Sequence, residues 1–207
     1  MSRTRPLLHA ILAAALGLSL VALLGVSATA QSARTARAKA TCNGARATKV
    51  GSKKSERIVG TRRRDVIYAG PGKDKVYGRG GNDLICGGPG ADTIDGGPGD
   101  DRLSGQTGKD TVRAGDGNDI ATGGSGRDKL TGGAGNDRLG GGRGADQVDG
   151  ERGADTIYGG PGADTLTARD SNERIFGGPG ADRITGGSGA DTIDADPASG
   201  DTDSGDP

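Results

Sequence analysis

The sequence has very few of the residues that build an ordinary globular core or an active site. Of 207 residues, one is Phe, three are Tyr and none is Trp, which excludes a core built around aromatic side chains. The only histidine is His9, and it falls inside an N-terminal segment that we expect to be removed. A Ser-His-Asp or Cys-His site is therefore excluded from the mature chain, and we predict that the protein is not an enzyme.

The chain also has no net charge, although its positive and negative residues are unevenly distributed. Residues 1–64 contain 13 Lys and Arg against the single acid Glu56, whereas residues 65–207 contain 14 Lys and Arg against 26 acids. Such asymmetry is typical of an interaction arm joined to a body of opposite charge. It keeps open an alternative function, cell-surface adhesion through an anionic polymer bound by the basic arm or by a sheet face. Nothing in the sequence indicates nucleic-acid binding.

Long apolar runs are absent except in residues 1–30, which we interpret as a signal peptide. Arg3 and Arg5 precede an apolar stretch at 7–26, and Ala28-Thr29-Ala30 forms a small-residue cleavage motif. The alternative is an uncleaved anchor, because a stretch of about 20 apolar residues approaches the length that spans a bilayer. Cleavage predicts a secreted, extracellular protein that is free of the membrane.

Cysteine is scarce, with only Cys42 and Cys86 in the chain. An even count in a secreted protein favours one disulfide, which would join the basic N-terminal segment to an early part of the acidic body. Two unpaired thiols are the alternative. The spacing does not match a zinc site.

What the sequence does contain is a nine-residue period that runs without a slip from Glu56 to Asp191. Every ninth residue is an aspartate, except for Glu56 and Glu173. A Val, Ile or Leu follows two positions later in almost every unit, with Ala121 as the weak case and Ile120 one place early. Eight units carry the full pattern Gly-Gly-x-Gly-x-Asp, such as residues 87–92.

The period predicts an all-β solenoid. Three residues around each apolar position favour a strand, and the other six form turns in which glycine permits positive φ. A helix is excluded because no 3.6-residue period exists, and collagen is excluded because glycine does not recur at every third residue. Two units then make one coil of 18 residues, with strands on opposite faces and turns on opposite edges.

This coil stacks the acids in two columns, one on each edge. Carboxylates on neighbouring coils, about 4.8 Å apart, repel by about 3.5 kcal/mol at an effective dielectric near 20. A divalent cation between successive acids would reverse that repulsion. Calcium fits best because it accepts carboxylate and carbonyl oxygens in irregular geometry, whereas magnesium requires a stricter octahedron and soft metals need His or Cys.

The units resemble the RTX, or haemolysin-type, calcium-binding nonapeptide repeat Gly-Gly-x-Gly-x-Asp-x-U-x, in which U is a large apolar residue. The resemblance covers residues 51–194 and implies a right-handed parallel β-roll of about eight coils. It also implies calcium ions between turns one coil apart, held by aspartate carboxylates and turn carbonyls. The implied metal ligands are Asp74, Asp83, Asp92, Asp101, Asp110, Asp119, Asp128, Asp137, Asp146, Asp155, Asp164, Asp182 and Asp191.

The domain organisation that we predict has four parts: a signal peptide at 1–30, a basic linker or arm at 31–50, the β-roll at 51–194 and an acidic disordered tail at 195–207. The chain has no protease, lipase or haemolytic region of the kind that accompanies the repeats in toxins. One apolar residue per nine is a thin core for the backbone that must be ordered. We therefore expect calcium-dependent folding and a structural or interaction role. The sequence does not indicate an oligomeric state.

Overall fold

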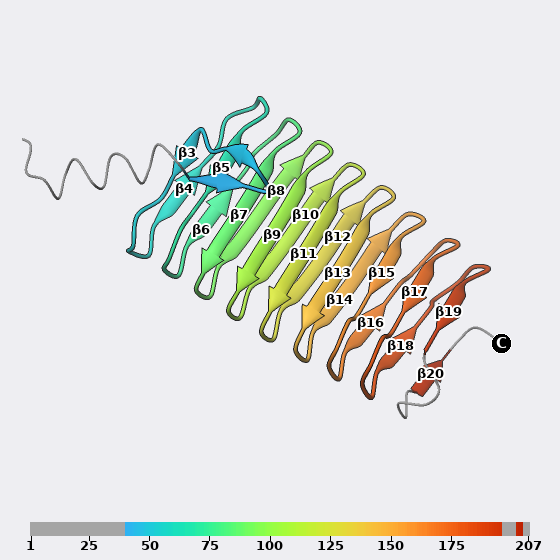
Figure 1. Ribbon diagram of the computed structural model, residues 1–207. Coiled ribbons are helices and arrows are strands. Elements are labelled where there is room, and N and C mark those ends of the chain that lie inside the picture. The colour runs from blue at the N-terminus through green and yellow to red at the C-terminus, as the bar shows by residue number, and fades with distance from the viewer. Residues whose placement is uncertain (1–39, 196–201, 205–207) are drawn as a thin grey trace, which may run out of the picture. The chain divides into compact units, whose positions relative to one another are not determined.

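The computed structural model describes residues 40–195 and 202–204, which all belong to the second of two units, Ala40–Pro207. The predicted signal peptide at 1–30 and the cleavage motif lie outside the described residues, as do residues 31–39 of the expected arm. In the described part, Figure 1 shows a stack of short strands connected by turns at two opposite edges. It contains no helix long and apolar enough to cross a membrane.

The strands form two parallel nine-stranded sheets, and consecutive strands alternate between them. The even sheet contains β4 (Arg57–Val59), β6 (Lys75–Tyr77), β8 (Thr93–Pro98), β10 (Thr111–Asp116), β12 (Lys129–Ala134), β14 (Gln147–Arg152), β16 (Thr165–Thr167), β18 (Arg183–Thr185) and β20 (Thr202–Ser204). The odd sheet contains β3 (Lys49–Val50), β5 (Val66–Tyr68), β7 (Leu84–Pro89), β9 (Arg102–Thr107), β11 (Ile120–Ser125), β13 (Arg138–Arg143), β15 (Thr156–Tyr158), β17 (Arg174–Phe176) and β19 (Thr192–Asp194).

The pairing register confirms the predicted solenoid. Val112 on β10 pairs with Leu130 on β12, and Ala121 on β11 pairs with Leu139 on β13. Each residue thus meets the one 18 positions further along, which makes two nonapeptides one coil. Within the segment expected to be a disordered tail, β20 pairs with β18, with Thr202 opposite Arg183.

The core is a single row of apolar side chains from each sheet, enclosed between the two. The residues two positions after the acids are buried from Ile67 to Ile184. The weak unit keeps the same register, because Ala121 points inward and is fully buried while Ile120 is only half-buried. The acid-to-apolar spacing therefore fixes which side chains enter the core.

The central strands are longer than the three residues that the period predicts. From β7 to β14 each strand has six residues and extends into the first residues of the following turn, such as Gly87-Gly88-Pro89 in β7. Gly115 of β10, for example, pairs with Gly97 on one side and Gly133 on the other. Parallel coils in exact 18-residue register align the N–H and C=O groups of a turn as well as those of a strand, so the ladder continues into the turn.

Residues 40–50 of the expected arm are ordered. An antiparallel hairpin forms from β1 (Thr41–Cys42) and β2 (Ala45–Arg46), joined by Asn43 and Gly44 with φ of 46° and 82°. Both central residues of such a two-residue turn require positive φ, which Asn-Gly supplies.

The hairpin is attached to the body by the disulfide between Cys42 and Cys86, whose Cα atoms are 5.6 Å apart. Cys42 and Cys86 form a small buried cluster with Val66 and Leu84. The predicted pairing is therefore made, and it joins β1 to β7 across 44 residues of sequence.

Removal of this disulfide should destabilise the N-terminal coils. We expect the double variant Cys42→Ala, Cys86→Ala to lose about 2–4 kcal/mol in the free energy of unfolding, because the unfolded chain gains a large loop. Chemical unfolding in calcium measures the loss. A reductant should lower the stability of the wild type to that of the variant and leave the variant unchanged; equal stability of the two proteins without reductant would contradict the expectation.

Candidate metal centre

The repeated acids lie inside the solenoid and not at its solvent-exposed edges. From Asp74 to Asp164 the periodic aspartates are at most 3% exposed, and Asp182 is 2% exposed. The sequence correctly predicts the two columns, but the repulsion that it considers between neighbouring carboxylates is not their largest cost. Burial itself is the larger cost, because a carboxylate that leaves water loses its hydration.

One oxygen of each carboxylate is used to join coils. The backbone N–H of Asp74 donates to Oδ1 of Asp92 at 2.8 Å, and the N–H of Asp92 donates to Oδ1 of Asp110 at 2.8 Å. The same bond recurs at 18-residue steps along both columns. All thirteen predicted aspartates belong to these two ladders, and the step from Glu173 to Asp191 closes the second one at 3.0 Å.

The second oxygen is the one that a cation would satisfy. Oδ2 is buried and has no hydrogen-bond donor within the described residues in Asp74, Asp83, Asp92, Asp101, Asp110, Asp119, Asp128, Asp137, Asp146, Asp155, Asp164 and Asp191. A buried carboxylate oxygen without a donor carries a substantial desolvation penalty. Because the same unbonded oxygen recurs in successive coils, the structure contains a series of equivalent candidate sites.

The first glycine of the unit allows these oxygens to approach the backbone. A Cβ on Gly141 would lie 2.7 Å from Oδ2 of Asp146 and 2.8 Å from the carbonyl oxygen of Gly159. Gly141 does not have positive φ, so the close oxygens and not its backbone conformation require glycine here. The carboxylate of one coil and a carbonyl of the next coil thus converge on the same glycine.

A second convergence occurs at the third glycine of the unit. A Cβ on Gly162 would overlap the carbonyl oxygen of Gly144 and would lie 3.1 Å from Oδ1 of Asp164. Oxygens from successive coils therefore lie close to the same position in the turns. No group of three or more Asp, Glu, His or Cys side chains gathers within the described residues, so a cation must take backbone carbonyls along with carboxylates. This all-oxygen donor set fits calcium.

Burial raises the pKa of the column aspartates in the metal-free chain. It raises the pKa to about 7 for Asp101, Asp110, Asp137 and Asp164, and to about 6 for Asp92, Asp119 and Asp155. The backbone N–H bonded to Oδ1 offsets part of the increase, and neighbouring carboxylates add to it at several positions. Each such group near neutral pH needs either a proton or a cation.

Glu56 and Asp65, the first two acids of the columns, differ from the rest because protein groups donate several hydrogen bonds to their carboxylates. Ser52 donates to Glu56 through its backbone N–H and its hydroxyl, both at 2.8 Å. Lys49 Nζ donates to Oδ1 of Asp65 at 2.5 Å, and Thr61 donates to Oδ2. Burial favours a higher pKa for Asp65, but these bonds outweigh it and lower the pKa below 3.8.

Glu173 interrupts the second column. Its turn has no glycine, and its carboxyl group is buried at 1% exposure. Burial and the neighbouring carboxyl group of Asp191 raise its pKa to about 7. The backbone N–H of Glu173 still donates to Oδ1 of Asp191, and the longer side chain also brings its own carboxyl group beside that of Asp191.

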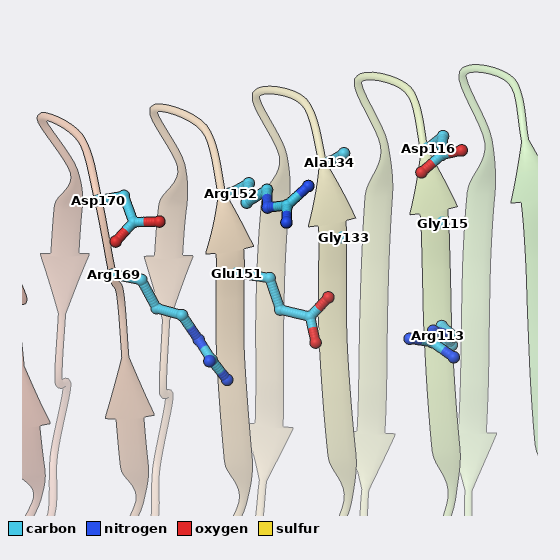
Figure 2. Close-up of a pocket in the computed structure, with 9 residues that line it drawn as sticks. All are labelled: Arg113, Gly115, Asp116, Gly133, Ala134, Glu151, Arg152, Arg169 and Asp170. Atoms are coloured by element: carbon cyan, nitrogen blue, oxygen red, sulfur yellow. The ribbon is translucent and has the colours of Figure 1, made fainter.

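A groove of 560 Å³ is lined by residues of β10, β12 and β14 and of the turn after β16. Figure 2 shows its charged side chains spread over successive coils, among them Arg113, Glu151 and Arg169. Arg169 pairs with Asp149, and the lining mixes both signs of charge. No acid in the groove is surrounded by apolar residues, so the groove lacks the environment that adjusts the pKa of a general acid or base.

Comparison with known proteins agrees with the geometry. The family model of the RTX calcium-binding nonapeptide repeat matches residues 50–85, 87–121, 113–148, 140–172 and 167–197. The chain therefore belongs to this family, whose repeats are a structural calcium-binding element and are not typically catalytic. A search of curated proteins finds no match to the chain.

The raised pKa values predict how the metal-free fold depends on pH. A carboxyl group with a higher pKa in the folded chain contributes its full stability below its unfolded pKa of about 3.8 and loses it as pH rises through the folded value. Without calcium, the solenoid should therefore be most stable near pH 4 and should unfold as pH rises through about 6 to 7. Circular dichroism of calcium-free protein across this range tests it, and stability that increases with pH would contradict it.

Adjacent glycines provide a matched test of the oxygen approach. Gly141→Ala should weaken calcium binding and lower stability, because its methyl group collides with Oδ2 of Asp146 and the carbonyl of Gly159. Gly140→Ala is the control, since its Cβ would lie 3.7 Å from Thr122 Cγ2, an ordinary contact. We expect a calcium midpoint raised about tenfold or more for Gly141→Ala and unchanged for Gly140→Ala; equal effects of the two variants would refute the role of Gly141.

Proposed function

We propose that the protein binds several calcium ions in its turns and folds when it binds them. The thirteen aspartates that the sequence identifies as ligands would supply carboxylate oxygens, and the turn glycines would supply carbonyl oxygens. A bound calcium ion supplies positive charge and accepts about six to eight oxygens. The observation that carries this proposal is the column of buried Oδ2 atoms without a donor.

Calcium-dependent folding follows from the same atoms. In the unfolded chain each carboxylate is hydrated, whereas in the folded chain its Oδ2 is buried in every coil from Asp74 onward. The folded state therefore offers binding sites that the unfolded state lacks, and calcium stabilises it by mass action. At a pH above the raised pKa values, the uncompensated charges oppose folding in the absence of the ion.

We also propose that the protein acts outside the cell and that its role is not enzymatic. The Cys42–Cys86 disulfide suits an oxidising compartment, and extracellular calcium modules work at about 10⁻⁴–10⁻³ M calcium. In such a setting the chain would act as a rigid structural or interaction module whose folding is controlled by calcium.

Calcium titration at about pH 8, above the raised pKa values, tests the proposal. Isothermal calorimetry should detect binding, and circular dichroism should show a gain of strand structure with calcium but not with the same concentration of magnesium. Asp137→Asn should move the midpoint to higher calcium, because it removes charge from a buried carboxyl group. Asp116→Asn is the control, since Asp116 is exposed and outside the columns. Unchanged strand content in the presence of a chelator would refute the proposal.

A further inference from the structure

The first two coils carry a cluster of exposed cations that calcium binding does not require. The members of this basic patch are Lys53, Lys54, Arg57, Arg62, Arg63, Arg64, Lys73, Lys75 and Arg79, and all nine are exposed. In residues 40–80 the only acids are Glu56, Asp65 and Asp74, which are the periodic acids of the columns. The exposed charge of this end is therefore positive, unlike that of the acidic body.

The fold places the patch across one face and both edges. Arg57 on β4 and Lys75 on β6 are paired neighbours on the outer side of the even sheet. Lys53, Lys54 and Lys73 lie in turns that lead into this sheet, whereas Arg62–Arg64 and Arg79 lie in turns that leave it. A continuous basic strip thus crosses the width of the solenoid at β4 and β6, which Figure 1 shows near the N-terminal end of the stack.

The patch is costly to the fold by itself. Arg57 and Lys75 are like charges directly opposite each other in a ladder, which is a destabilising arrangement. Neither ion pair seen within the described residues, Lys49–Asp65 or Arg169–Asp149, includes a patch member. Nine cations kept together without such pairs favour recognition of an external anion over internal stabilisation.

One cation of the patch is held in place. The guanidinium carbon of Arg57 lies 4.7 Å from the ring centroid of Tyr77, in a cation–π contact. This contact restrains the guanidinium group of Arg57 beside the Tyr77 ring. Arginine fixed in this way can bind carboxylate or sulfate oxygens in bidentate fashion with little loss of side-chain entropy.

We infer that the basic patch binds a linear acidic polysaccharide, through the sulfate or carboxylate groups of the polymer. A single-stranded nucleic acid would need open aromatic rings for base stacking, but Tyr77 is the patch ring and Arg57 covers it. A DNA duplex is read by an element that enters a groove, whereas the patch lies on a flat sheet and its turns. Membrane binding would need exposed apolar side chains among the cations, and no Val, Ile, Leu or aromatic side chain in residues 51–80 is exposed.

The test compares two full-length variants of equal charge, both in calcium. The patch variant carries Lys53→Gln, Lys54→Gln, Arg62→Gln and Arg64→Gln. The control variant carries Arg102→Gln, Lys109→Gln, Arg127→Gln and Lys129→Gln, which are exposed cations further along the solenoid. Binding to immobilised dextran sulfate and to hyaluronate is measured by surface plasmon resonance at several salt concentrations, with uncharged dextran as the reference. Circular dichroism during calcium titration checks that both variants fold like the wild type.

We expect the patch variant to bind at least about tenfold more weakly than the wild type and to show a shallower salt dependence, because fewer counterions are released. The control variant should stay within about twofold of the wild type. Preference for dextran sulfate or hyaluronate distinguishes sulfate from carboxylate recognition. Equal loss in both variants, or binding that salt does not weaken, would overturn the inference. Tighter binding to a DNA duplex or to anionic lipid vesicles than to either polysaccharide would overturn it as well.

Discussion

The carboxylates buried in successive turns from Asp74 to Asp164 are the constraint on which this structure depends. Oδ1 accepts a backbone N–H from the preceding coil, so the acid is part of the hydrogen-bonded ladder. Oδ2 has no such donor, so the group that joins the coils also makes them unstable when it is ionised and alone. Folding, proton uptake and cation binding are therefore linked at the same atoms.

The composition of the chain follows from this constraint. Oxygens of two coils closely approach Gly141 and Gly162, so the structure has no space for a side chain at these positions. The apolar interior is filled by about one side chain from each strand. Aromatic side chains have little space inside, and their scarcity in the sequence reflects a core that is narrow along its whole length. Tyr158 and Phe176 instead stack on each other from neighbouring strands of the odd sheet.

The sequence predicts the coil, the register and the core, because each depends only on spacing. The distance of 18 residues between like positions is enough to pair Val112 with Leu130. Spacing does not reveal which atoms a side chain bonds to, which is why the bond from Oδ1 to a backbone amide was not predicted. The preference for Asp over Glu was a signal for it, since a shorter side chain can reach back to the ladder. The β1–β2 hairpin lies outside the period, although Asn43-Gly44 was a local signal for its turn.

The disulfide has a further consequence for a ladder made of near-identical rungs. If one coil were looped out, every later acid and apolar residue would still meet an equivalent partner, so the pairing energy alone distinguishes poorly between alignments. The disulfide holds Cys42 of the hairpin against Cys86 of β7. The covalent link thus favours a single alignment for the coils between the hairpin and β7.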